Sequence, residues 1–274
     1  MKTLQLETKV KQTLNKIKIP KNARILVAMS GGKDSATIAY LLHKFGYKIE
    51  GFHIDLKIGD YSERCKKAVE ELCKNLGIKL YLYDTKKNLG AGMCYIRTAV
   101  QNSPGKNKLK NCAICGVVKK WIFNKEARRI KANYIATGHN LDDEAQTFLM
   151  NISKGSPKLS ANIGFVTRNI ANKKFIPRIK PLFYIPENDV REYAIKMKLP
   201  HVKDKCPCAI DSYRIQIREF LNTLPSKDKE NIIRNFEKVR KRIEKKKDIR
   251  MFYCENCGEP SRNKICRKCE LMKI

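Results

Sequence analysis

Apolar and polar positions divide most of the chain into short buried runs and longer segments with helical spacing. Residues 25–29 are continuously apolar, which is typical of a strand buried in a parallel sheet. In the next segment Ile38, Leu41, Leu42 and Phe45 share one helical face. The same patterns predict further strands at 48–55, 79–84, 134–137 and 178–182, and further helices at 61–76, 112–131, 141–151 and 186–198. We therefore expect an α/β fold with a doubly wound, mostly parallel sheet.

Four domains or segments are expected. Residues 1–22 read as a basic amphipathic helix that packs on the main domain, and residues 23–200 form that domain. Within it, residues 86–111 and 154–177 are expected to be irregular and basic. Residues 201–250 form a helical extension with helices at 212–221 and 227–250, and residues 251–274 form a small terminal unit. The apolar face of the last helix is assigned to Ile232, Ile233, Phe236, Val239 and Ile243.

One turn between a strand and a helix carries the first chemical signal. The sequence SGGKDS at 30–35 follows the strand at 25–29 and opens the next helix. A glycine pair lets the backbone approach a ligand closely, and the helix start offers free N–H groups to an anion. The pattern is not a Walker A loop. It resembles the signature of the PP-loop ATP pyrophosphatases, which split ATP between the α and β phosphates.

Charge and hydropathy limit the kinds of partner that this protein can have. The 274 residues carry 58 basic and 27 acidic side chains, a formal net charge of +31. Such an excess favours a polyanionic partner, with nucleic acid first among them, although solvated lysines explain part of it. No apolar run has transmembrane length, and the N-terminus is too polar for a signal peptide. We expect a cytoplasmic protein without membrane association.

Eleven cysteines divide into clustered and isolated ones. Two C-x-x-C pairs near the end, eight residues apart, predict a zinc ribbon held by Cys254, Cys257, Cys266 and Cys269. The pair Cys112 and Cys115 has no adjacent partner pair, so it cannot close a four-thiolate site. A third ligand from Cys206 or Cys208 would suit a [4Fe–4S] cluster with one open iron. The alternatives are a thioredoxin-like dithiol or no role. The isolated Cys65, Cys73 and Cys94 are expected to be small buried hydrophobes.

Two further stretches lie where a nucleotide would bind. In a parallel sheet the ligand crevice lies at the carboxyl ends of the strands. The backbone of Ile54 is therefore expected to contact adenine, in preference to the side chain of His53. In GHNLDDEA at 138–145, Gly138 allows close approach of a nucleotide, and Asp143 would orient a ribose hydroxyl or help hold Mg²⁺. The alternative is that the acidic residues here only stabilise a helix start.

Taken together, these blocks resemble one enzyme family. SGGKDS at 30–35, FHIDLKIGDYS at 52–62, CAICGVVKK at 112–120 and TGHNLDDEA at 137–145 occur in that order, followed by RIKPLF at 178–183, CP at 206–207 and the paired C-x-x-C elements. The set resembles the TtuA-type tRNA 2-thiouridine synthetases, including the archaeal and eukaryotic wobble-uridine relatives, over nearly the whole chain after residue 22.

The resemblance implies a fold, a reaction and a set of residues. The fold is the HUP-like PP-loop domain, and the reaction is adenylation of a tRNA uridine at its C2 oxygen followed by sulfur transfer. Cys112, Cys115 and Cys206 match the three cluster-binding cysteines, and Asp34 and Lys119 match the catalytic pair. The positions that match nucleotide contacts are Ala28, Met29, Ser30, Gly31, Gly32, Lys33, Asp34, Ser35, Ile54, Lys119, Gly138 and Asp143.

The resemblance also implies ATP as co-substrate, Mg²⁺, and a homodimer. The sulfur donor is left open between a ubiquitin-like thiocarboxylate carrier, a persulfide and sulfide, and the target uridine between the wobble position and the T-loop. Two departures stand out: an N-terminal zinc finger common in the family is missing, and Cys208 adds a thiol beside Cys206. The alternatives are a 2-thiocytidine or lysidine synthetase with the same loop, and a non-catalytic zinc-ribbon RNA-binding protein.

Overall fold

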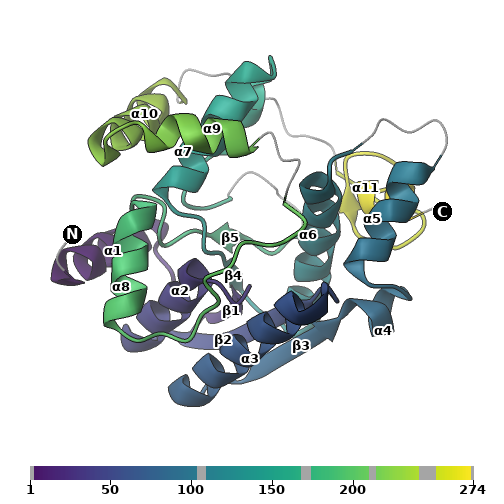
Figure 1. The fold of residues 1–274 in the computed structure, drawn as a ribbon, viewed down its shortest axis with the longest axis horizontal. Helices are drawn as coiled ribbons and strands as arrows, with labels where there is room; N and C mark the ends of the chain where they lie inside the picture. The colour runs from purple at the N-terminus through teal and green to yellow at the C-terminus, as the bar shows by residue number, and fades with distance from the viewer. Residues whose placement is uncertain (1–2, 104–108, 168–173, 210–213, 241–250, 273–274) are drawn as a thin grey trace.

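The fold is organised on a five-stranded parallel sheet (Figure 1). The computed structural model describes residues 3–103, 109–167, 174–209, 214–240 and 251–272. The strand order in the sheet is β3-β2-β1-β4-β5. The strands are β1 (Arg24–Ala28), β2 (Lys48–Asp55), β3 (Leu80–Asp84), β4 (Tyr134–Ala136) and β5 (Arg178–Ile179), and every pair in the sheet is parallel. The order reverses beside β1, so the predicted doubly wound α/β fold is confirmed.

Helices cover both faces of the sheet, and β1 shows why. Its residues Ile25 and Val27 belong to one core, while Leu26 between them belongs to the other. The first core is closed by α1 (Thr3–Ile17), α2 (Lys33–Lys44), α3 (Gly59–Leu76) and α8 (Glu187–Lys196). The second core is closed by α4 (Thr85–Leu89), α5 (Met93–Asn102), α6 (Asn111–Arg129) and α11 (Arg267–Leu271).

A third apolar cluster joins the remaining helices. These are α7 (Leu141–Ser153), α9 (Arg214–Asn222) and α10 (Ser226–Arg240), which lie together at the top of Figure 1. The rings of Phe148 and Phe236 lie 4.6 Å apart between α7 and α10. A 3₁₀ turn, η1 (Pro157–Asn162), and a two-stranded ribbon of β6 (Phe252–Tyr253) and β7 (Pro260–Ser261) complete the chain.

Several local expectations need correction. The segment 86–111 was expected to be irregular, but it contains most of α4 and all of α5, because Met93, Ile96 and Val100 have helical spacing and pack in the second core. Residue Cys94 on α5 is exposed, whereas burial was expected. Strand β5 ends at Ile179 rather than at 182, since Pro181 has no N–H for the sheet.

Three further comparisons concern the flanking helices. Helix α1 packs on the main domain as expected, with Leu6, Val10 and Leu14 in the first core. On α10, Ile233 and Phe236 are buried but Val239 is exposed, so the expected apolar face is narrower. The part of that helix expected at 241–250, including Ile243, lies outside the described residues. Among the described helices, none is both long and apolar enough to cross a membrane.

Candidate active site

The loop between β1 and α2 is shaped as an anion cradle. The Ser35 hydroxyl donates to the Gly32 carbonyl at 2.9 Å and accepts from the Ser30 amide at 3.2 Å, which folds the loop back on itself. No side chain caps the start of α2 at Gly32. The amides of the first helical turn are therefore left for a ligand, and an anion such as phosphate is the ligand that their partial positive charge favours.

Gly31 has a demanding position in this loop. Its φ is +85°, and a Cβ built there would lie 2.7 Å from the Cα and Cβ of Cys65 on α3. Gly31→Ala is therefore expected to destabilise the protein by about 2–4 kcal/mol, through backbone strain and overpacking. Urea unfolding measures this change.

Gly46→Ala is the matched control, because Gly46 has a similar φ of +74° but open space around it. It is expected to cost only the strain, about 1–2 kcal/mol. Equal losses in the two variants would show that the Gly31–Cys65 contact is not tight.

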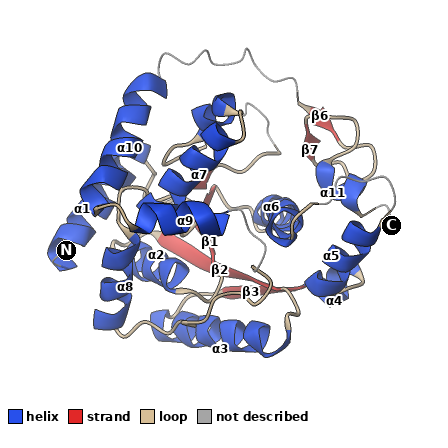
Figure 2. Ribbon diagram, turned by 45° about the horizontal axis from the view of Figure 1, so that its top comes forward, coloured by secondary structure: helices blue, strands red, loops and turns tan. Residues whose placement is uncertain are grey.

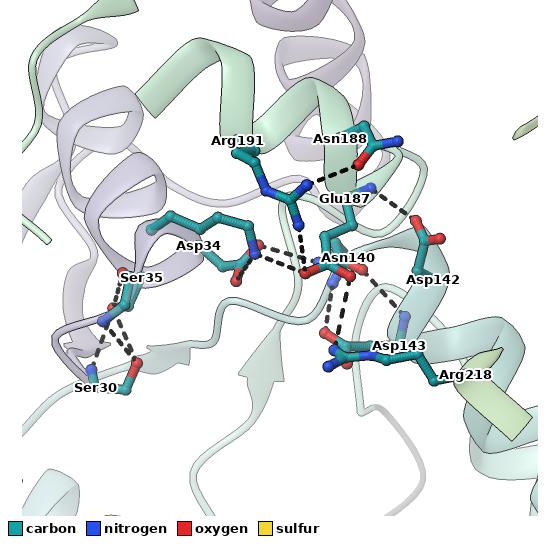
Figure 3. A network of polar contacts seen from close by, with 12 residues as sticks. Ser30, Asp34, Ser35, Asn140, Asp142, Asp143, Glu187, Asn188, Arg191 and Arg218 are labelled. Carbon is teal, nitrogen blue, oxygen red and sulfur yellow. Dashed lines mark hydrogen bonds and ion pairs between the residues drawn. The ribbon is translucent and has the colours of Figure 1, made fainter. Parts of the chain in front are cut away.

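Asp34 joins the loop to two other segments of the chain (Figure 3). One carboxylate oxygen accepts from Lys33 Nζ at 2.9 Å, and the other accepts from Asn140 Nδ2 at 3.0 Å. The same lysine bonds Glu187 at the start of α8 at 2.9 Å. Burial raises the pKa of Asp34, while Lys33 and Asn140 oppose the rise. The carboxylate is thus held directly by Lys33 and Asn140, and Glu187 of α8 holds the lysine.

Gly138 closes the site from the β4 side. A Cβ built on it would lie 3.0 Å from the Cβ of Asp34 and 3.1 Å from the amide of Ser35. The turn after β4 therefore packs directly against the start of α2. Only a residue without a side chain permits this approach without displacing the loop.

The acidic residues at the start of α7 have different roles. Asp143 forms a capping box with Asn140 and pairs with Arg214 at 3.3 Å. Asp142 accepts from the amide of Glu187 at 2.7 Å (Figure 3). It also pairs with Lys229 of α10 at 2.8 Å. The helix-start interpretation thus accounts for the capping box of Asp143, while both carboxylates also pair with a cation on another helix.

A group of cations lines the same edge of the sheet. Partial burial lowers the pKa of Lys120, and the neighbouring Arg178, Lys180 and Arg214 lower it further. Local desolvation and the same cations lower the pKa of His139, although this residue stays exposed to solvent. Four positive charges held together in this way favour an anionic ligand. Lys120, Arg178 and Lys180 fall in the quoted blocks at 112–120 and 178–183 but had no role assigned to them, and Arg214, Asn140 and Glu187 had none either.

Of the expected cluster ligands, Cys112 and Cys115 lie on α6 and Cys206 lies near Cys115, but the three sulfur atoms are not among the described groups close enough together to hold one metal ion. Cys112, Cys115 and Lys119 follow at helical spacing, while Ile114 and Val118 face the second core. Cys112 is exposed and Cys115 is half-buried. Burial raises the pKa of the Cys206 thiol. The nearby Lys119 lowers this pKa, and Cys115 raises it further. Cys115, Lys119 and Cys206 therefore lie within electrostatic reach of one another.

The segment around Cys206 also contacts the phosphate loop. The Val202 amide donates to the Gly31 carbonyl at 2.8 Å, and Asp204 pairs with Arg64 of α3 at 3.1 Å. Lys119 in turn acts on Cys65, the residue against which Gly31 packs. The loop at 30–35 and the cysteine segment thus share one edge of the sheet.

The two residues at the end of β2 are packed in the interior. The ring of His53 is buried and bonds the Met29 carbonyl at 2.8 Å through Nδ1, and burial lowers its pKa. The side chain of Ile54 is buried in the second core. These contacts favour the packing role for the His53 side chain over contact with a ligand.

The four C-terminal cysteines form a compact thiol site. The sulfur atoms of Cys254, Cys257, Cys266 and Cys269 all lie within 4.8 Å of one another. Although burial raises the pKa of Cys254, backbone N–H groups of the ribbon lower it to about 6. Four thiol donors at this spacing suit one tetrahedral metal ion.

This ribbon is docked on α6, beside which it lies in Figures 1 and 2. Trp121 of α6 packs against the cysteine cluster, and Lys268 lies 4.4 Å above its ring. Arg128 of α6 pairs with the buried Glu259, which also accepts from Asn124 at 3.1 Å. The metal site is thus attached to the helix that carries Cys112, Cys115 and Lys119.

Comparison with known proteins agrees with this geometry. The model of the PP-loop domain family matches residues 2–224. A tRNA-5-methyluridine(54) 2-sulfurtransferase of Pyrococcus horikoshii is 37% identical over 96% of this chain and 83% of its own length. The tRNA 2-thiolation protein NcsA of Haloferax volcanii is 31% identical over 90% of this chain and 81% of its own.

Among solved structures, the U34-tRNA thiolase NcsA from Methanococcus maripaludis with its [4Fe-4S] cluster matches with a TM-score of 0.79 and 28% identity, over 98% of this chain and 86% of that one. The expected resemblance is confirmed by these matches, since the homologues are tRNA 2-thiolation enzymes with a PP-loop domain. The chain belongs to the PP-loop family and, within it, to the tRNA 2-thiolation proteins.

Proposed function

We propose that this protein is a tRNA 2-thiolation enzyme that activates the C2 oxygen of a uridine with ATP and replaces it with sulfur. The observation that carries the proposal is the bond from Val202 to Gly31, since it ties the cysteine segment to the phosphate loop. A nucleotide held by the loop and a thiol set built on Cys206 would then share one crevice.

The loop residues bind and orient ATP in this scheme. The amides at the start of α2, with Ser30 and Ser35, hold the phosphates that leave as pyrophosphate. Asp34 places those phosphates with Mg²⁺, and Lys119 stabilises the charge that develops as the uridine oxygen attacks the α phosphorus. The adenylated oxygen then leaves as AMP when sulfur attacks C2.

The thiols of Cys112, Cys115 and Cys206 are the residues that would hold a [4Fe–4S] cluster. Two of them lie in mutual electrostatic reach beside Lys119, and a set of three suits a cluster with one open iron. When bound, the cluster would supply a coordination position for the sulfur that enters the uridine.

Among the remaining assignments, zinc rests on the spacing and geometry of the four cysteines, and the others rest on the family. We propose Zn²⁺ in the C-terminal ribbon, a homodimer, and a cytoplasmic location, with a thiocarboxylate carrier, a persulfide or sulfide as donor. Residues 23–200 would bind the nucleotide, and 201–250 would supply Cys206. Residues 1–22 and the ribbon at 251–274 would support that domain, since α1 lies in its core and the ribbon lies on α6.

The direct test is anaerobic reconstitution with iron and sulfide, followed by incubation with tRNA, ATP and Mg²⁺. We expect AMP, pyrophosphate and 2-thiouridine, which digestion and mass spectrometry would map to position 34 or 54. Normal thiolation by a Cys112→Ala/Cys115→Ala protein would refute the proposal. Finding 2-thiocytidine or lysidine would identify one of the other loop enzymes, and no AMP in the presence of tRNA would indicate an RNA-binding protein.

Metal removal from the ribbon has a built-in reporter. Trp121 is the one tryptophan of the chain and packs on the four cysteines, so its emission reports on this site. Isolated zinc-finger peptides gain roughly 10–16 kcal/mol from their metal. Stripping the zinc is therefore expected to shift Trp121 emission to the red and to lower Tm. Cys73→Ser, at a buried cysteine outside the ribbon, is expected to keep its zinc. Metal loss without a change in emission would contradict the docking of the ribbon on α6.

A further inference from the structure

A pair of thiols outside the expected ligand set shares one buried arginine. Arg97 of α5 donates from Nη2 to Cys208 Sγ at 2.8 Å and to Cys94 Sγ at 3.0 Å. Both sulfur atoms thus contact the same nitrogen, and each thiol also acts electrostatically on the other. Their sulfur atoms therefore lie side by side, although the residues are far apart in sequence.

Arg97 is itself unusual. It is only 6% exposed, and no carboxylate of the described residues lies within ion-pair distance of it. The groups that raise its pKa against burial are Cys208, Cys94 and Cys115. Buried arginine is costly without an anionic partner, so a guanidinium that faces sulfur atoms suits a site where sulfur becomes anionic.

The pair also leads from the surface to the expected cluster cysteines. Cys94 is exposed, while Cys208 and Cys206 are half-buried. The Ala209 amide donates to the Cys206 carbonyl at 3.1 Å, a turn that keeps Cys208 beside Cys206, and Cys206 lies in reach of Cys115 and Lys119. The Cys208 carbonyl accepts from Asn111 at 3.4 Å, next to Cys112. A sulfur atom received at Cys94 would be released beside Cys206.

We propose that Cys94 and Cys208 form a dithiol that accepts sulfane sulfur from a persulfide donor and releases it as sulfide next to the cluster cysteines. This inference rests on the proposed function and specifies its sulfur source. Arg97 orients both sulfur atoms and stabilises the departing hydrosulfide.

The chemistry balances in three steps. Cys94 Sγ attacks the terminal sulfur of the donor R–S–SH, the donor S–S bond breaks, and R–SH leaves with the proton of Cys94. Cys208 Sγ then attacks Cys94 Sγ of the resulting persulfide, which expels HS⁻ and forms a Cys94–Cys208 disulfide. The two thiols supply the two electrons that reduce the sulfane sulfur, and an external small dithiol reduces the disulfide again.

The first experiment follows sulfur on the full-length protein without tRNA. The protein is incubated anaerobically with glutathione persulfide, then alkylated and digested for peptide mass spectrometry, and free sulfide is measured. We expect a Cys94–Cys208 linked peptide pair and about one sulfide per chain, as the stoichiometry of exchange requires. In Cys208→Ser the added sulfur should stay on Cys94 with at least tenfold less sulfide, and Cys94→Ser should give neither product.

The controls separate this pair from other thiols. Cys73→Ser removes a buried thiol elsewhere in the fold and should behave as wild type. Wild-type sulfide release by Cys94→Ser, or sulfur loaded on other cysteines in the wild type, would overturn the proposal.

A second experiment keeps this inference distinct from the proposed function. In the reconstituted tRNA assay, Cys94→Ser should thiolate normally with inorganic sulfide but at least tenfold more slowly with glutathione persulfide. Equal rates with the two sources would refute the dithiol role and leave the proposed function intact. Absence of thiolation by the wild type with either source would refute the proposed function instead.

Discussion

Replacing Lys119 with alanine is expected to lower the rate of tRNA thiolation by about 10²–10³-fold, the usual effect of removing one group that stabilises developing charge. Lys119 is half-buried on α6, and its charge reaches His53, Cys65 and Cys206. It therefore lies between the phosphate loop and the cysteine segment.

The measurement is single-turnover formation of AMP and of 2-thiouridine with reconstituted protein. Lys125→Ala is the matched control, because Lys125 belongs to the same helix but stacks on Trp121 at 4.9 Å. It should thiolate at the wild-type rate. The iron content and the visible spectrum of Lys119→Ala should match those of the wild type. The loss of activity would then come from the chemical step and not from loss of the cluster. Wild-type AMP formation by Lys119→Ala would contradict the assigned role.

The fold was predictable because local signals agreed with the overall topology. The apolar run at 25–29 and the glycines that follow it predict β1 and its loop, and the structure has both. Periodicity also located α3 and α6 to within a few residues. It failed at α5, where a basic composition outweighed the spacing of Met93, Ile96 and Val100.

The polar network of the site was largely hidden from the sequence. The bond of Lys33 to Glu187 and that of Asp142 to Lys229 join residues far apart in the chain. Nothing in the local pattern of Glu187 distinguishes it from an acidic residue at an ordinary helix start. The position of Cys94 beside Cys208 likewise depends on how α5 packs, which periodicity does not determine.

A shared crevice predicts that Asp34 and Cys115 lie on one face of the sheet, and the structure contradicts this prediction. Helices α2 and α6 pack on opposite faces of the sheet, but each follows a strand and precedes the next parallel one. Both therefore begin at the carboxyl edge, where Asp34 and Cys112 lie in their first turns. The contact of Val202 with Gly31 then joins the two sides across that edge.

Asp34→Asn is expected to lower ATP cleavage by about 10²–10³-fold while leaving stability unchanged or higher. Burial raises the pKa of Asp34, which means that the fold disfavours its ionised form relative to the unfolded chain. An amide removes this cost and has the same shape. Lys33 keeps its bond to Glu187, so the loop retains a partner for its cation.

The two expectations are measured as tRNA-dependent AMP formation and as Tm. Glu187→Gln is the matched control, because it removes a carboxylate from the same lysine at the start of α8, outside the phosphate loop. It should keep most of the activity. If Glu187→Gln were as inactive as Asp34→Asn, the loss of activity would come from removing a negative charge beside Lys33. If Asp34→Asn lost activity and also unfolded several degrees earlier, the carboxylate would be supporting the fold. A large loss of AMP formation at undiminished Tm, with Glu187→Gln active, would assign Asp34 to the phosphates. The substitution would then leave the fold at least as stable while removing a group that the reaction needs.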